Sequence, residues 1–130
     1  MAGMKFYLAA RFPRRAEMEV LADELVAKLP SAVCVARWVY GGEEGLDRRQ
    51  IALLDLEDVE KANTVILFTH PRGSKQTGGG RFVEFGYALA KGKRCIVIGE
   101  YENVFISHPS VLVYRDWAEF LHNEVPADAK

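Results

Sequence analysis

Short apolar runs alternate along the chain with stretches in which apolar residues recur every three or four positions. The runs are rich in β-branched and aromatic residues, which is typical of strands, whereas the spacing of three and four is typical of helices that bury one face. The pattern predicts strands over residues 5–10, 32–39, 64–69, 94–99 and 111–114. It predicts helices over residues 14–29, 47–62 and 81–91, and a last helix that packs through Trp117, Phe120 and Leu121.

The alternation of strands and helices predicts a parallel sheet. The run TVILFT at residues 64–69 is almost continuously apolar, as expected for a strand that is covered on both faces. We therefore expect one α/β domain over residues 1–130, a doubly wound, flavodoxin- or Rossmann-like parallel sheet of five strands in the order 2-1-3-4-5, with helices on both faces. Ligands bind such sheets where the strand order reverses, which places residues 9–13 and 70–80 at the expected site.

Composition limits the range of partners. Seventeen Lys and Arg residues oppose eighteen Asp and Glu residues, so a surface that coats nucleic acid is not expected. No apolar run approaches the roughly 20 residues of a membrane span, and the first residues lack the features of a secretory signal. Cys34 and Cys95 lie inside apolar runs, which predicts reduced core thiols in a cytoplasmic protein.

The balanced total hides one uneven segment. Glu84 is the single acid between residues 70 and 94, a segment that also holds six basic residues: Arg72, Lys75, Arg81, Lys91, Lys93 and Arg94. It follows the glycines Gly78, Gly79 and Gly80, whose amides can approach a ligand closely. We expect Glu84 in the first turn of a helix, where the helix dipole and nearby cations favour its carboxylate form. This makes Glu84 a candidate nucleophile or base, although a glutamate that only complements the dipole fits the same pattern.

Three further polar positions are candidates. Asp55 falls in the middle of the apolar face of the 47–62 helix, where a carboxylate is costly unless it is paired or used. A partly exposed residue at the edge of that face explains it equally well. Tyr7, in the first strand, is by default a core aromatic. Arg11, followed by Arg14 and Arg15, stands where a phosphate can bind, but a solvated helix start is the favoured interpretation.

Several known motifs are absent. The segment GGGRFVEFG does not match G-x-G-x-x-G, because Val83 stands in place of the third glycine. The chain contains neither a G-x-x-x-x-G-K-[ST] phosphate loop nor a G-x-S-x-G elbow. His70, His108 and His122 have no metal-site spacing, so a zinc site is not supported.

Three segments resemble a known family. FYLAARF, DLEDVEKANTVILF and above all GGGRFVEFGYALAKGKRCIVI are similar to the nucleoside 2-deoxyribosyltransferases and the related nucleoside 5′-monophosphate N-glycosidases. The resemblance runs from about residue 5 to residue 114, and E-x-G-Y-A-L-A-x-G-K, starting at Glu84, is its most specific element. It implies cleavage of the N-glycosidic bond through a covalent glycosyl–glutamate intermediate, released to water or to another nucleobase. It implies no metal or organic cofactor.

The resemblance also assigns roles to individual residues. Glu84 matches the nucleophile, Tyr7 the tyrosine whose hydroxyl holds it, and Asp55 the aspartate that orients and helps protonate the nucleobase. Asn103 matches an asparagine that is lent to the neighbouring subunit, where it binds the 5′ end of the sugar. A homodimer or larger assembly acting on a small nucleoside or nucleotide is therefore expected. Gly78 departs from the pattern, since transferases usually carry an aspartate there and monophosphate hydrolases a serine.

The glycine at position 78 leaves the substrate and the activity open. Arg11, Arg81 and the free amides of Gly78, Gly79 and Gly80 can replace a serine as phosphate ligands, which slightly favours a nucleotide over a free nucleoside. The missing side chain also fits a catalytically weak nucleotide-binding or sensing module on the same fold. A carrier of flavin mononucleotide is less consistent, because no hydroxyl-rich loop follows the first strand.

Overall fold

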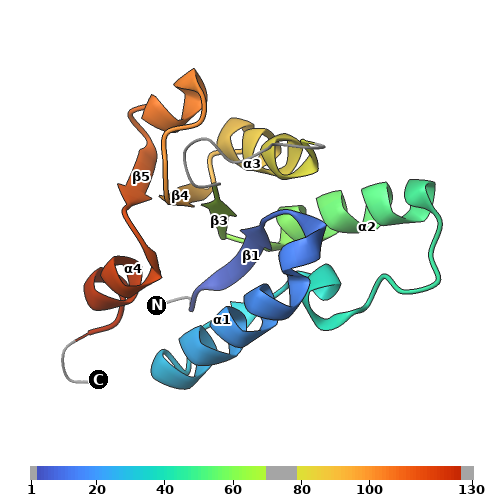
Figure 1. The fold of residues 1–130 in the computed structure, drawn as a ribbon, viewed down its shortest axis with the longest axis horizontal. Helices are drawn as coiled ribbons and strands as arrows, with labels where there is room; N and C mark the ends of the chain where they lie inside the picture. Colours follow the sequence, from blue (N-terminus) through green and yellow to red (C-terminus); the bar gives the residue numbers. More distant parts are fainter. Residues whose placement is uncertain (1–2, 70–78, 127–130) are drawn as a thin grey trace.

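The computed structural model describes residues 3–69 and 79–126 (Figure 1). Its strands are β1 (Lys5–Ala9), β2 (Val33–Cys34), β3 (Thr64–Phe68), β4 (Arg94–Ile98) and β5 (Val111–Tyr114). Its helices are α1 (Arg15–Lys28), α2 (Arg48–Lys61), α3 (Gly80–Ala90) and α4 (Trp117–Glu124), with short 3-10 helices η1 (Phe12–Arg14), η2 (Arg37–Tyr40) and η3 (Val104–Ser107). None of the helices in these two described ranges is long and apolar enough to cross a membrane.

The five strands form one sheet in the predicted order, β2-β1-β3-β4-β5, and each pair of neighbours is parallel. Figure 1 shows α2 and α3 on one face of the sheet and α1 and α4 on the other. Every residue of β3 is buried, which explains its continuous apolar run. The doubly wound α/β prediction is therefore confirmed, and it leaves the ends of the central strands β1 and β3 at the reversal of strand order.

The second strand is much shorter than predicted. Residues 32–39 were expected to be one strand, but only Val33–Cys34 pairs with β1, and the chain then turns into η2. The indole of Trp38 donates a hydrogen bond of 2.9 Å to the carbonyl of Leu8, and both Trp38 and Val39 are buried. The apolar run therefore arises because a short 3-10 helix is buried at the sheet edge. The periodicity of the sequence does not distinguish such a helix from a strand.

The helix starts follow local capping chemistry. Asp47 caps α2 by accepting a hydrogen bond of 2.8 Å from the amide of Gln50, whose side chain accepts one of 2.9 Å from the amide of Asp47. This capping box confirms the predicted cap. Helix α3 begins at Gly80, one residue earlier than predicted, and its first turn contains no acid. Glu84 therefore lies in the second turn of α3, and its predicted place in the first turn is wrong.

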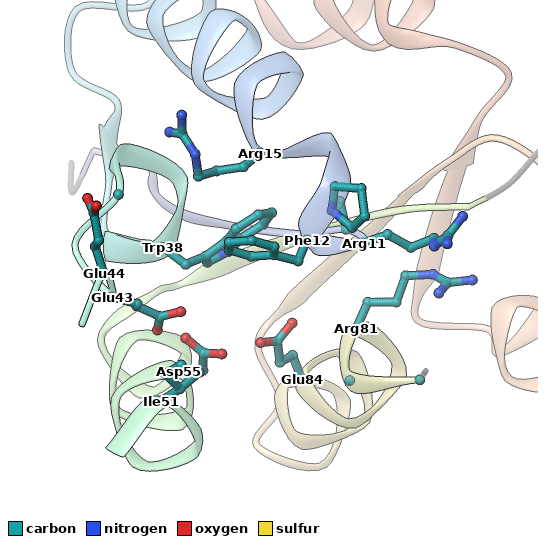
Figure 2. Close-up of a pocket in the computed structure, with 15 residues that line it drawn as sticks. Arg11, Phe12, Arg15, Trp38, Glu43, Glu44, Ile51, Asp55, Arg81 and Glu84 are labelled. Atoms are coloured by element: carbon teal, nitrogen blue, oxygen red, sulfur yellow. The ribbon is translucent and has the colours of Figure 1, made fainter. Parts of the chain in front are cut away.

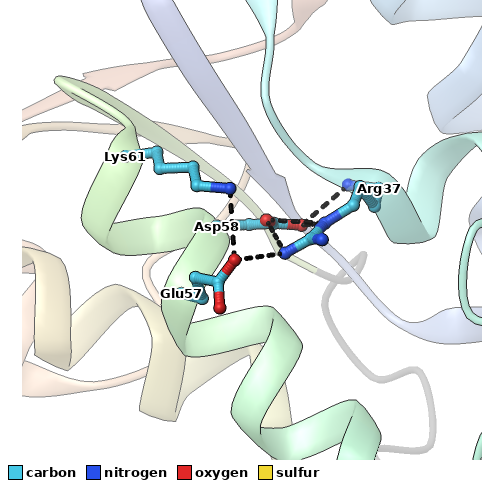
Figure 3. Close-up of polar contacts among 4 residues, drawn as sticks. All are labelled: Arg37, Glu57, Asp58 and Lys61. Carbon is cyan, nitrogen blue, oxygen red and sulfur yellow. Dashed lines mark hydrogen bonds and ion pairs between the residues drawn. The ribbon is translucent and has the colours of Figure 1, made fainter.

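A buried carboxylate joins η2 to α2. Asp58 is 1% exposed and accepts hydrogen bonds of 2.9 Å from both the backbone amide and the Nε of Arg37. Glu57 accepts from Arg37 and from Lys61 at the surface (Figure 3). The loop over residues 41–46 leaves η2 directly, so this network holds the start of the loop against α2.

Both cysteines are free, as predicted: Cys95 is buried and Cys34 half-buried. Burial raises the pKa of each thiol to about 11. The two thiols are therefore unreactive core groups at neutral pH.

Candidate active site

A cavity of about 780 Å³ opens beyond the carboxyl end of β1, at the reversal of strand order. Its walls come from the segment after β1, from η2 and the loop after it, from α2, and from the start of α3 (Figure 2). The lining residues include Ala10, Arg11, Phe12, Pro13, Arg15, Trp38, Glu43, Ile51, Asp55, Gly79, Gly80, Arg81 and Glu84. This volume is typical of a small-molecule site, and the predicted location is confirmed for residues 10–13, 79 and 80. Residues 70–78, Gly78 included, lie outside the described part of the chain.

Tyr7 holds Glu84, which lines this cavity. Tyr7 is fully buried in β1, and its hydroxyl donates a hydrogen bond of 2.6 Å to Oε2 of Glu84. Burial and, after it, the negative charge of Glu84 raise the pKa of the Tyr7 phenol far above its ordinary value. Tyr7 is therefore a permanent donor, and it fixes the orientation of the Glu84 carboxyl group.

The ionisation of Glu84 differs from the prediction. Its pKa is raised to about 8, chiefly by burial and in addition by the neighbouring Asp55, while the hydrogen bond from Tyr7 acts in the opposite direction. The expected stabilisation of the carboxylate by the helix dipole is confined to the first turn of a helix, and Glu84 lies beyond it. Glu84 is thus desolvated, and the prediction that its carboxylate form is favoured is wrong.

Asp55 faces the cavity from the middle of α2, as its position in the apolar stripe suggested. Figure 2 shows its carboxyl group beside that of Glu43 and on the same side of the cavity as Glu84. Burial raises the pKa of Asp55, while hydrogen bonds to Glu43 and Glu84 lower it. The three carboxyl groups therefore form one electrostatically linked set.

Glu43 is the site residue that the sequence did not reveal. It is 9% exposed, and burial, followed by its hydrogen bond to Asp55 and the charge of Asp55, raises its pKa to about 8. The next residue, Glu44, is exposed. In the segment GGEEG nothing distinguishes one glutamate from the other, because their difference in burial comes from the packing of this loop against α2.

Arg81 lines the cavity but already has an anionic partner. Its guanidinium group makes an ion pair of 3.1 Å with Glu102, both side chains are almost fully buried, and the group lies 4.3 Å from the centre of the Phe82 ring. Glu102 therefore compensates the charge of Arg81, the residue that the sequence predicted as a phosphate ligand.

The other described cations of the basic segment do not surround Glu84. Their partners are glutamates elsewhere, in the ion pairs Lys91–Glu60 (3.4 Å), Lys93–Glu60 (3.7 Å) and Arg94–Glu124 (2.7 Å). Two further arginines that line the cavity, Arg11 and Arg15, come from the segment after β1. Figure 2 shows the guanidinium groups of Arg11 and Arg81 at the end of the view opposite Glu43 and Asp55.

Asn103 lies away from these residues. Its side chain accepts a hydrogen bond of 3.0 Å from the amide of Phe105 and caps η3, and it is not among the described residues that line the cavity. The apolar side chains around it are strongly exposed: Tyr101 is 64%, Val104 74% and Phe105 64% accessible. The predicted donation of Asn103 to a neighbouring subunit stays a prediction.

Solved structures share this architecture. The CMP N-glycosidase BcmB of Clostridium botulinum superposes with a TM-score of 0.61 at 17% identity, covering 91% of this chain and 95% of that chain. The 2-deoxyribosyltransferase of Bacillus psychrosaccharolyticus superposes with a TM-score of 0.67 at 19% identity, covering 96% of this chain and 95% of that one. The chain has the fold of these two enzymes. No protein-family model and no curated protein sequence matches it.

The deoxyribosyltransferase-like fold agrees with the family resemblance of the sequence, and the match spans nearly the whole chain. At identities of 17% and 19%, a shared fold does not establish a shared reaction. Any proposed chemistry therefore has to rest on the geometry of the cavity. Among the described residues no group of three His, Cys, Asp or Glu side chains is arranged to hold a metal ion.

Proposed function

We propose that the protein cleaves the N-glycosidic bond of a nucleoside or nucleoside 5′-monophosphate, with Glu84 as nucleophile. The observation that supports this most directly is the 2.6 Å hydrogen bond by which the buried Tyr7 holds Glu84 at the cavity, with Asp55 facing the same space. A fixed carboxylate and a second carboxyl group at the same cavity are the groups that retaining glycoside chemistry needs. The shared fold of an N-glycosidase and a deoxyribosyltransferase agrees with the proposal.

The proposed reaction has two displacements. In the first, a carboxylate oxygen of Glu84 attacks C1′, the C1′–N bond breaks, and its electron pair leaves with the base, which Asp55 or a water molecule protonates. In the second, water or another nucleobase attacks C1′ and the glycosyl–Glu84 ester bond breaks, which restores the carboxylate. Tyr7 donates to Glu84 throughout and limits the rotation of its carboxyl group.

A phosphorylated substrate is favoured over a free nucleoside. Arg11 and Arg81 line the cavity, and the backbone at Gly79 and Gly80 borders it at the start of α3, where amides are available to an anion. The carboxyl groups of Glu43 and Asp55 lie at the other end in Figure 2. We therefore orient the phosphate towards the arginines and the base towards Glu43 and Asp55.

Base release tests this function directly. A panel of nucleosides, 2′-deoxynucleosides and their 5′-monophosphates is incubated with the protein, with and without an acceptor base, and free bases are separated by chromatography. Glu84→Gln is expected to lower base release by about 10³-fold or more, since the amide is no nucleophile. Glu60→Gln, an exposed carboxylate of α2 remote from the cavity, is the matched control. Base release by Glu84→Gln at the rate of the control contradicts the proposal.

A nucleotide-binding module without turnover is the second candidate. The raised pKa of Glu84 favours it, because a carboxyl group with a pKa of about 8 is largely protonated at pH 7 and is then a poor nucleophile. Titration calorimetry with the same panel separates the two candidates. Tight binding of a nucleotide without base release between pH 6 and 9 supports the binding module and excludes the enzyme.

A further inference from the structure

Two carboxylate oxygens at the base end of the cavity lack a hydrogen-bond donor. They are Oε2 of Glu43 and Oδ1 of Asp55, and both are buried without a partner among the described residues. Glu43 is 9% exposed and lines the cavity together with Asp55. A buried, unpartnered acceptor is costly, so one at a ligand cavity indicates a group that the ligand or a proton completes.

Two adjacent carboxyl groups do not both ionise in such a place. The two carboxyl groups lie beside each other in Figure 2, and ionised oxygens only accept, so Glu43 and Asp55 can hydrogen-bond to one another only if one of them carries a proton. Burial disfavours the second negative charge, as it does in other paired carboxyl groups that share a proton. The pKa of Glu43, raised to about 8, agrees with a proton retained at neutral pH.

The charges around the pair leave this proton in place. Asp58 on α2 raises the pKa of both Glu43 and Asp55, and Glu84 on α3 raises that of Glu43 while its hydrogen bond lowers that of Asp55. Arg37 on η2 is the cation that favours ionisation of Asp55, but its guanidinium group is already bound to Asp58 and Glu57. The guanidinium group of Arg15, on α1, donates to Glu19 and to the carbonyl of Val39.

Glu84 is the less suitable holder of the proton. Its Oε2 accepts the short hydrogen bond from Tyr7, a fully buried phenol that has to find an acceptor, and a carboxylate accepts better than a carboxylic acid. No such donor supports Oε2 of Glu43 or Oδ1 of Asp55 within the described residues. The reactive form is therefore the one in which Tyr7 supports an ionised Glu84 and the pair keeps one proton, and burial of Glu84 limits how much of the protein is in this form at pH 7.

We propose that Glu43 and Asp55 form a carboxylic acid–carboxylate pair whose shared proton is delivered to the leaving nucleobase. This rests on the proposed function and adds Glu43 as a catalytic group. As C1′–N breaks, the electron pair moves to the base nitrogen, which takes the proton and leaves both carboxylates ionised. When water opens the glycosyl–Glu84 ester, one of its protons returns to the pair, so the groups are restored after each turnover.

Glu43→Gln removes the proton and retains the shape. The amide donates a hydrogen bond to Asp55, so the loop keeps its contact, but it supplies no acid. On ordinary nucleotides the variant is expected to lose about 10²-fold or more in kcat and the high-pH limb of the wild-type pH profile. On 7-methylguanine nucleotides, whose base is already cationic and leaves without a proton, it is expected to stay within about threefold of wild type. Glu43→Asp, which can carry the proton, is expected to restore part of the loss, and Glu60→Gln is the charge control.

An equal loss on both substrates indicates a structural role for Glu43 and overturns the proposal, and so does no loss on either.

A second measurement does not depend on activity. Carbon-13 NMR of labelled carboxyl groups is expected to show Glu43 or Asp55 titrating well above pH 6, with that titration changed in Glu43→Gln. Ordinary values near 4 for both residues refute the shared proton even if the enzyme cleaves nucleotides. A wild-type protein that releases no base, while the shifted titration is present, contradicts the proposed function and the delivery step but not the shared proton.

Discussion

The candidate site concentrates three acidic side chains in one small volume. Burial is the largest cause of the raised pKa of Glu43, Asp55 and Glu84, and Asp55 adds to the electrostatic cost of ionising the two glutamates. Tyr7 compensates only Glu84, through a single hydrogen bond. Burying three acidic groups together lowers the stability of the fold. Proteins commonly retain such a cost at sites where binding or catalysis needs a desolvated charge.

This cost gives a pH dependence of stability with a defined sign. The pKa values of Glu43 and Glu84 rise from 4.5 to about 8 on folding, so between these values the folded protein binds more protons than the unfolded chain. Their contribution is fully present below about pH 4.5, and it is lost as the pH rises towards 8. We expect Tm to fall over this range, and Glu43→Gln to melt at least about 3 °C above wild type at pH 8.5 but not at pH 5.

Thermal unfolding followed by circular dichroism at both pH values measures this difference. Glu60→Gln changes the net charge equally without touching the cavity, and its Tm is expected to follow that of wild type at each pH. If the Glu43→Gln and wild-type curves are parallel between pH 5 and 8.5, Glu43 ionises normally in the folded protein.

At the scale of the elements, the contacts that hold η2 between β1 and α2, called here the η2 joint, determine where Glu43 lies. Helix η2 is fixed on one side by the hydrogen bond from Trp38 to Leu8 and on the other by the bonds from Arg37 to the buried Asp58. The loop that carries Glu43 starts immediately after η2, and Asp55 lies one turn before Asp58 on α2. The joint thereby sets the position of one carboxyl group relative to the other.

Removal of the Asp58 carboxylate is therefore expected to affect both stability and the site. Asp58→Ala leaves the amide of Arg37 without its acceptor, and we expect a loss of about 1–3 kcal/mol in the free energy of unfolding, measured with urea. We also expect lower base release per folded molecule, because the loop is less firmly held. Glu57→Gln, which changes only an exposed partner of Arg37, is the control and is expected to have a much smaller effect. An Asp58→Ala protein of wild-type stability and activity contradicts this role of the joint.

At the scale of the whole molecule, the exposed apolar segment around η3 bears on assembly. Tyr101, Val104 and Phe105 are each more than half exposed, and Asn103 lies among them, outside the cavity of its own chain. The buried ion pair of Arg81 with Glu102 connects this segment to the start of α3 and so to the cavity. A second copy that covers the segment agrees with the prediction of a homodimer that shares Asn103 between subunits.

Subunit mixing tests this sharing. If each site combines Glu84 of one chain with Asn103 of the other, Glu84→Gln and Asn103→Ala homodimers are both inactive on nucleotides. Refolding an equimolar mixture is then expected to restore about a quarter of wild-type base release, because half of the dimers contain one intact site out of two. Light scattering is expected to give the dimer mass. A fully active monomer at micromolar concentration, or a mixture that recovers no activity, contradicts shared sites.

The sequence was sufficient for the sheet order, for the Asp47 cap and for the place of the cavity, because each follows from local pattern and from general rules of strand connection. It was also sufficient to identify Glu84 and Asp55 as anomalous carboxylates. It failed at η2, where burial by Trp38 and Val39 produced the apolar run of a strand.

The sequence by itself determined that this chain folds as a doubly wound α/β domain and that a glutamate after a glycine-rich loop lies near its ligand site. Only the tertiary structure decided which charges share that site. It paired Arg81 with Glu102, turned Lys91 and Lys93 to Glu60, and brought Glu43 to Asp55. The physical reason is that ionisation depends on burial and on neighbours a few ångströms away, and residues distant along the chain supply both.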